Sequence, residues 1–172
     1  ADNGIYRIVN LKYNLAMAED FTGEKMICDE IGNEESYTQL WKLSKKGSGW
    51  TFQNIYTGNY IKNAGSFYTQ VLTTNTAITY YLQENAAAYK SYNMWPGSNI
   101  PYSLHCDANN NIVPWYKGSG EITASEWGFQ KVEVSDSMIK AAHAKYKAYK
   151  DLVNNDEFCN GYMEFYTDAS CT

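Results

Sequence analysis

Three pairs of an aromatic residue and an asparagine four positions later recur at a regular spacing in this chain, and this spacing constrains the fold more than any other feature. The pairs are Tyr6 with Asn10, Trp50 with Asn54, and Tyr89 with Asn93. Their first members lie 44 and 39 residues apart. A second aromatic series consists of Trp41, Tyr80 and Trp127. In two places the second series precedes the first by nine residues. Two markers that share a period of roughly 40 residues predict a chain built from three similar units.

The composition limits the classes of protein and partner. With 172 residues, 44% of them hydrophobic, the chain is long enough for one globular domain with its own core. It has no run of about 18 apolar residues, so we expect no helix that spans a membrane. Its net charge is −5 and Arg7 is its single arginine. This balance argues against nucleic acid as a partner, because phosphate binding depends on Lys and Arg.

The cysteines are Cys28, Cys106, Cys159 and Cys171. None forms a CxxC pair and the chain has two histidines, so we expect no structural zinc site and no cofactor. The even number of cysteines favours disulfides in an oxidising compartment, and the start at Ala1 is typical of a processed chain, so we expect a secreted protein. Three pairings are possible. We favour a local Cys159–Cys171 bond with Cys28–Cys106, because closing a short loop costs the least entropy.

Residues 4–134 read as a barrel of short strands. In this region short apolar and aromatic runs alternate with turns rich in Gly, Asn and Ser, with no helical segment between them. The predicted strands are Tyr6–Val9, Leu15–Ala18, Leu40–Leu43, Trp50–Gln53, Tyr60–Ile61, Thr79–Leu82, Tyr102–Cys106, Ile112–Trp115 and Trp127–Val134. Many short strands in three units favour a threefold barrel, with repeats at about 4–47, 48–86 and 87–134.

Residues 135–172 differ in character. Ser135, Asp136 and Ser137 are candidate N-caps for a helix over Met138 to Val153. Its apolar stripe consists of Ile139, Ala142, Tyr146, Tyr149 and Val153. This stripe can pack on the barrel, or on a second protomer to make a homodimer. Residues 154–172 read as a tail closed by its own cysteines.

The aromatic markers include a Gln-x-Trp motif. It is intact at Gln39-Leu40-Trp41 and degenerate at Tyr80 and at Ser125-Glu126-Trp127. With these motifs the chain resembles the ricin B-chain-like β-trefoil lectin family, and residues 102–127 look like the third repeat of secreted fungal members. The resemblance covers residues 4–134. It implies an all-β β-trefoil, a carbohydrate-binding function, and core positions for the aromatic residues of the second series.

The family's binding positions can be carried over one repeat at a time. The position that is usually Asp in the family aligns with Met17, Lys62 and His105 in the three repeats. The aromatic residue that stacks on the sugar aligns with Cys28 or Asp29, with Leu72 or Thr73, and with Trp115. The third repeat alone pairs a polar side chain with a ring. The resemblance therefore implies one glycan or glycoprotein site, made of His105, Asp107, Asn109, Asn111 and Trp115. Its affinity should be weak, on the order of 4–5 kcal/mol.

Other functions find less support. The two histidines belong to no catalytic motif, so we expect a protein that is not an enzyme. The acidic residues between positions 19 and 35 lack the spacing of a calcium loop and read as a solvated face. The loss of two sugar sites favours one alternative, a β-trefoil that binds a protein target as a protease inhibitor or secreted effector. Such a target would contact loops such as 94–101.

Overall fold

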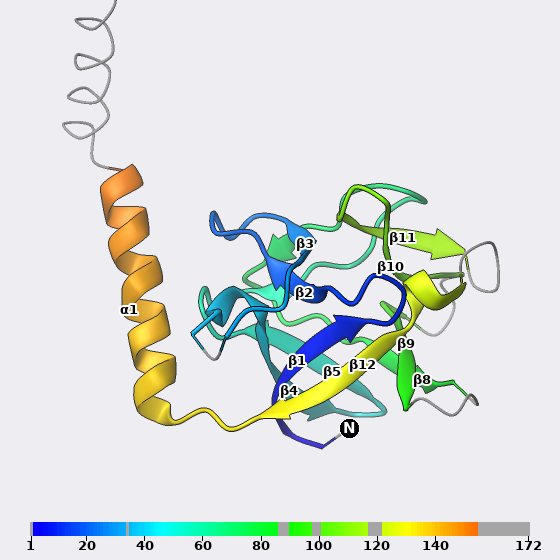
Figure 1. Cartoon of the computed structure of the whole chain (residues 1–172), viewed down its shortest axis with the longest axis horizontal. Helices are drawn as coiled ribbons and strands as arrows, with labels where there is room; N and C mark the ends of the chain where they lie inside the picture. Colours follow the sequence, from blue (N-terminus) through cyan, green and yellow to red (C-terminus); the bar gives the residue numbers. More distant parts are fainter. Residues whose placement is uncertain (1, 34, 86–89, 98–100, 117–121, 155–172) are drawn as a thin grey trace, which may run out of the picture.

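The computed structural model describes residues 2–33, 35–85, 90–97, 101–116 and 122–154, which form an antiparallel β-structure followed by one helix (Figure 1). The strands are β1 (Gly4–Asn10), β2 (Ala16–Glu19), β3 (Met26–Asp29), β4 (Leu40–Lys46), β5 (Gly49–Asn54), β6 (Tyr60–Ile61), β7 (Thr73–Thr74), β8 (Tyr81–Glu84), β9 (Ser91–Trp95), β10 (Tyr102–Cys106), β11 (Ile112–Tyr116) and β12 (Trp127–Val132). The helices are the short 3-10 turns η1 (Tyr37–Gln39) and η2 (Ile122–Ser125), and α1 (Asp136–Val153). The sequence did not predict β3, β7 or β9.

Six strands close a barrel. Strand β1 pairs with β4 on one side and with β12 on the other, and β4 continues to β5. Strand β9 joins β12 to β8. The bridge between Trp50 and Tyr80 closes the remaining gap, with a backbone hydrogen bond in each direction. Strands β1–β4, β5–β8 and β9–β12 lie within residues 4–47, 48–86 and 87–134, and we use these ranges as names for the three repeats.

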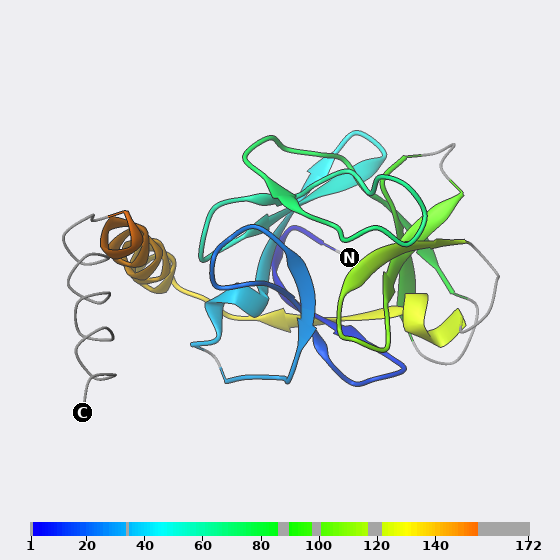
Figure 2. The same ribbon diagram turned by 90° about the horizontal axis from the view of Figure 1, so that it is seen from above.

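The remaining strands form three hairpins that cover one end of the barrel, and Figure 2 views this arrangement from above. They are β2–β3, β6–β7 and β10–β11. Backbone hydrogen bonds link them to one another: Val71 N–H donates to Ile112, and Met26 N–H donates to Val71. The Gln70 amide adds a bond of 2.6 Å to the Met26 carbonyl. The cap is therefore a joint structure of all three repeats, and side chains from different repeats meet at its surface.

The second aromatic series lies in the core, as predicted. Trp41, Tyr80 and Trp127 are fully buried. Each also donates one hydrogen bond to a backbone carbonyl of its own repeat. These bonds join Trp41 to Met17 at 2.9 Å, Tyr80 to Lys62 at 2.6 Å and Trp127 to Leu104 at 3.0 Å. Because a buried polar group needs a partner, the three bonds fix how each ring enters the core.

The asparagines of the first marker hold the ends of the repeats together. Asn10 and Asn54 are fully buried, and their side-chain amides donate to the carbonyls of Ala124 and Thr38. Both acceptors belong to the segments that precede the core tryptophans. Asn93 donates to the Ser125 carbonyl at 2.8 Å. The asparagines of the first marker therefore have a structural role. The aromatic partner of Asn93, Tyr89, lies outside the described residues.

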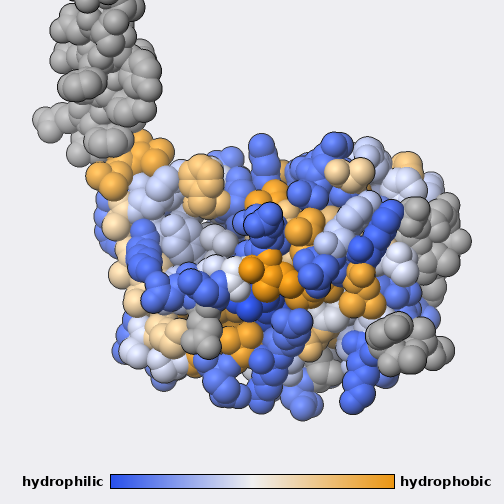
Figure 3. All heavy atoms as spheres, viewed as in Figure 1, coloured by the Kyte–Doolittle hydropathy of each residue, from blue (hydrophilic) through white to orange (hydrophobic). Residues whose placement is uncertain are grey.

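Helix α1 packs on the side of the barrel from Met138 to Tyr149, one of the two expected arrangements. Ser135 caps it by accepting from the Met138 N–H, and Ala142 is fully buried in a cluster with Tyr37, Leu40 and Ile55. Further along, Tyr146 packs on Tyr56, with ring centroids 5.1 Å apart. The C-terminal end extends past the barrel and carries hydrophobic side chains on its surface (Figures 1 and 3). No helix among the described residues is long and apolar enough to cross a membrane.

Candidate functional site

Hairpin β10–β11 positions the residues expected in the third-repeat site. His105 lies opposite Val113, and Trp115 lies two residues further along the same face. Their rings stack, with centroids 4.8 Å apart and planes inclined by 19°. His105 is 6% exposed, and its Nδ1 hydrogen-bonds to the Ser125 hydroxyl at 2.8 Å. His105 therefore supports Trp115 from the interior, while Trp115 is half-buried and keeps part of its ring at the surface.

The polar residues of the predicted site form the tip of the same hairpin. One Asp107 oxygen accepts from the backbone N–H groups of Asn109 and Asn111, at 2.9 and 2.8 Å. Asp107 is buried and its carboxylate closes the turn. Asn110 adopts a φ of 63°, which asparagine tolerates. The exposed Asn109 and Asn110 and the half-buried Asn111 are thus the polar residues that the turn presents outward.

The five predicted residues share one hairpin without forming one pocket. Along the hairpin, His105 lies between the turn and Trp115. The accessible groups are therefore the Trp115 ring near one end, and Asn109 and Asn111 at the other. Ser125 and His105 are of the residue types that form a nucleophile–base pair, and they share a hydrogen bond. Ser125 is 5% exposed, so a substrate cannot reach its hydroxyl group.

Phe67 and Tyr68 contact the Trp115 ring, and Phe67 also contacts Tyr102 and Tyr116; the sequence did not predict this group. The group is named the aromatic platform and consists of Phe67, Tyr68, Tyr102, Trp115 and Tyr116. The Phe67 ring lies 5.0 Å from Trp115 and 4.8 Å from Tyr116 between centroids. Phe67, Tyr68 and Tyr116 are 40%, 49% and 45% exposed. The adjacent aromatic pairs at 67–68 and 115–116 were the available signal, but no local pattern indicates that they meet.

The equivalent positions of the first and second repeats differ. Met17 and Cys28 are buried in the core cluster and the alternative stacking position, Asp29, is exposed, so the first repeat presents no ring there. In the second repeat Lys62 and Leu72 are exposed, and Thr73 donates its hydroxyl to the Gly23 carbonyl at 2.7 Å. Neither repeat contains a ring at the stacking position.

The expected Cys28–Cys106 disulfide is not formed in this structure. Both cysteines are buried free thiols, and they lie in hydrogen-bonding contact across the first and third repeats. Burial, followed by the neighbouring thiol, raises the pKa of Cys28 well above its ordinary value. The Cys106 thiol also donates to the Asp107 carbonyl at 3.7 Å. The expected Cys159–Cys171 bond lies outside the described residues.

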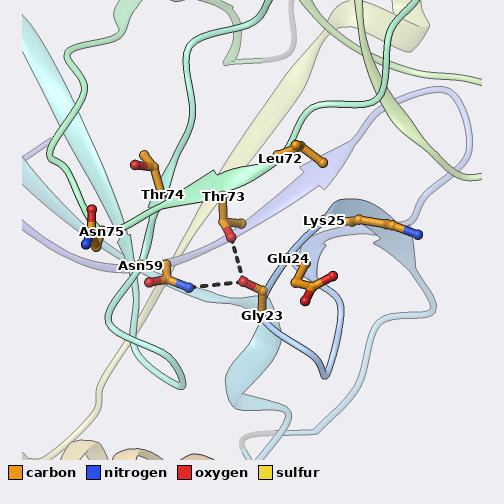
Figure 4. Close-up of a pocket in the computed structure, with 8 residues that line it drawn as sticks. All are labelled: Gly23, Glu24, Lys25, Asn59, Leu72, Thr73, Thr74 and Asn75. Atoms are coloured by element: carbon orange, nitrogen blue, oxygen red, sulfur yellow. Dashed lines mark hydrogen bonds between the residues drawn. The ribbon is translucent and has the colours of Figure 1, made fainter.

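A polar cleft of about 450 Å³ lies between hairpin β2–β3 and strand β7 (Figure 4). It is lined by Gly23, Glu24, Lys25, Asn59, Leu72, Thr73, Thr74 and Asn75. Both dashed hydrogen bonds in Figure 4 end on the Gly23 carbonyl, at 2.7 Å from Thr73 and 3.1 Å from Asn59. Two of its polar groups therefore serve the contact between the first two repeats.

Behind this cleft lies a buried carboxyl group. Glu19 accepts hydrogen bonds from Thr57 and Asn59, and burial raises its pKa above the ordinary value of 4.5. The group links the first two repeats from the inside. The described residues hold no group of three or more His, Cys, Asp or Glu side chains that could bind a metal ion.

Comparison with solved structures identifies the architecture. A ricin B-like lectin from Macrolepiota procera, solved in complex with lactose, superposes with a TM-score of 0.67 over 77% of this chain and 98% of that chain, at 15% identity. The Rhizoctonia solani agglutinin gives 0.61 over 77% and 97%, at 18% identity. The designed threefold protein ThreeFoil gives 0.62 over 76% and 100%, at 13% identity. The fold is a β-trefoil. No family model and no curated protein sequence matches the chain.

The β-trefoil with a C-terminal helix confirms the expected fold class. The similar structures include carbohydrate-binding lectins, and the low identities limit this likeness to the fold. The loop expected to contact a protein target, residues 94–101, includes residues 98–100, which lie outside the described residues. The tail at 155–172 also lies outside them.

Proposed function

We propose that this protein is lectin-like and binds glycan through hairpin β10–β11 of its third repeat. The observation that carries the proposal is the position of Trp115, whose ring is stacked on His105 at 4.8 Å and keeps part of its surface exposed. A pyranose presents hydroxyl groups and one small face of C–H groups. A fixed ring suits such a ligand because it packs on the C–H face, while polar side chains elsewhere on the same hairpin are available to sugar hydroxyls.

The other two repeats support the choice of the third. Their aligned stacking positions, Cys28 or Asp29 and Leu72 or Thr73, contain no aromatic ring, and the paired positions are Met17 and Lys62. A single shallow site should bind weakly, with an affinity on the order of 4–5 kcal/mol. The lactose held by the Macrolepiota procera lectin is a ligand of the class that we propose here.

The proposal includes no catalytic step. His105 is enclosed by Ser125 and Trp115, so the one histidine in the hairpin is committed to structure. The proposal retains the extracellular location expected from the cysteine content, because glycans are carried by secreted and cell-surface proteins.

The proposal is tested by a glycan array probed with the wild-type protein and with Trp115→Ala. The matched control is Phe21→Ala, which removes an exposed ring that packs on Tyr149 of α1, at a distance from the hairpin. We expect the wild type and the control to retain the same glycans and Trp115→Ala to lose them. A wild type that retains no glycan would contradict the proposal.

A further inference from the structure

We propose that the aromatic platform binds a single neutral oligosaccharide chain of two or more sugars, across the boundary between the second and third repeats. This inference rests on the proposed function and extends its site beyond Trp115. Phe67 and Tyr68 come from the segment between β6 and β7, whereas Tyr102, Trp115 and Tyr116 come from β10 and β11.

The platform is a continuous set of ring contacts. Phe67 is its centre, with centroids 5.0 Å from Trp115, 4.8 Å from Tyr116 and 6.2 Å from Tyr102. Tyr68 extends the set beyond Trp115, at 5.7 Å. Since one ring suffices to stack on one sugar, the three well-exposed rings of Phe67, Tyr68 and Tyr116 offer more area than a monosaccharide can cover.

Tyr68 is held in an unfavourable backbone conformation that keeps the platform in place. Its φ is 58°, in the left-handed region that is uncommon for a bulky side chain. Its N–H donates to the Pro114 carbonyl at 3.0 Å, which ties the second repeat to β11 directly beside Trp115. Such strain persists where the surroundings enforce it, and it concentrates at functional sites. The result is a set of rings that is ordered before any ligand arrives.

The platform is neutral, and this selects the ligand. The segments that build it, residues 63–71, 101–106 and 112–116, contain no Asp, Glu, Lys or Arg. A single-stranded nucleic acid also stacks on aromatic rings, but it needs positive charge along its backbone, and this chain has a net charge of −5. Within these ranges there is no cation for an acidic sugar, and Lys62 and Lys117 flank them in the sequence. An uncharged chain of sugars fits the surface.

The orientations of the rings favour a single chain over a flat surface. Neighbouring planes are inclined by 32° between Phe67 and Tyr116, 44° between Phe67 and Trp115, and 55° between Tyr102 and Tyr116. A stack of polysaccharide chains in a flat sheet cannot contact planes that turn in this way, whereas one chain can rotate between sugars. The Tyr102 and Tyr116 hydroxyls, 3.3 Å apart, lie within the platform and can bond to sugar hydroxyls.

The test is a calorimetric titration with neutral sugars of increasing length. The probes are galactose, lactose and lacto-N-neotetraose; N-acetylglucosamine to chitotetraose; and glucose to cellotetraose. For the series that binds, we expect wild-type affinity to rise about 3- to 10-fold from one sugar to the next, up to the length of the platform. In Phe67→Ala the single sugar should bind as in the wild type and this rise should be lost. Phe21→Ala should behave as the wild type.

The outcomes separate this inference from the proposed function. A wild type whose affinity does not change with length, or a Phe67→Ala variant that keeps the full rise, overturns the inference while glycan binding through Trp115 stands. A wild type that binds none of the probes and no arrayed glycan removes both. Raising the salt from about 50 to about 500 mM should leave the affinity unchanged, and a strong loss would contradict a neutral site. Tyr116→Ala, at the other side of Phe67, provides a second variant with the same expected result.

Discussion

Replacing Tyr80 with Phe removes one oxygen atom from the centre of the threefold core. The Tyr80 hydroxyl donates to the Lys62 carbonyl at 2.6 Å, and the ring is fully buried. The substitution leaves the Lys62 carbonyl without this donor, and losing a hydrogen bond at a buried site costs about 1–3 kcal/mol. A chain of this size loses about 2–4 °C in Tm for each kcal/mol. We therefore expect Tm to fall by about 3–6 °C, from a central loss of about 1.5 kcal/mol.

The measurement is urea unfolding followed by tryptophan fluorescence, with calorimetry for Tm. The matched control is Tyr81→Phe, which removes the same atom from the adjacent, half-buried residue at the start of β8. Since Tyr81 retains access to water, its substitution should change the free energy of unfolding by less than about 0.5 kcal/mol. Equal stabilities of the two variants would refute the reasoning that the buried hydrogen bond of Tyr80 stabilises the core.

Three further predictions concern stability. Burial raises the pKa of Glu19, so this group stabilises the folded state at low pH and loses that contribution as the pH rises above 4.5. The urea midpoint of Glu19→Gln should therefore fall less between pH 4.5 and 7 than that of the wild type. Equal changes of the two midpoints with pH would contradict this. The buried Ser103 hydroxyl has no hydrogen-bond partner among the described residues, so Ser103→Ala should stabilise the protein by about 1 kcal/mol in the same assay, and a loss of stability would reveal a hidden partner. Ala142→Asp places a carboxylate between α1 and the barrel and should cost about 2–4 kcal/mol, whereas Ala144→Asp on the exposed face should cost little; equal effects would mean that the helix does not depend on this contact.

The sequence predicted the parts of the fold that depend on repeated spacing. Trp41, Tyr80 and Trp127 were expected in the core because they recur in step, and they are fully buried. The helix stripe predicted the burial of Ala142 because helical periodicity alone defines it. Strand β7 was missed because two threonines in a polar run carry no alternating pattern.

The site was less predictable, because it depends on contacts between repeats. Alternation along a strand places His105 on one face of β10 but does not show that Ser125 and Trp115 cover its ring on that face. The meeting of Phe67 with Trp115 depends on how the second hairpin lies against the third in the cap, which no local pattern encodes. The sequence likewise identified Cys28 and Cys106 as a pair but not their state as free thiols.

The most direct test of glycan binding through the third repeat uses the indole N–H signals of the tryptophans in a ¹⁵N NMR titration with the best arrayed glycan. Trp41 and Trp127 lie in the core, whereas Trp115 keeps part of its ring at the surface. We predict that the Trp115 signal shifts progressively with added glycan while the Trp41 and Trp127 signals stay in place. An unchanged Trp115 signal at saturating glycan would contradict the account.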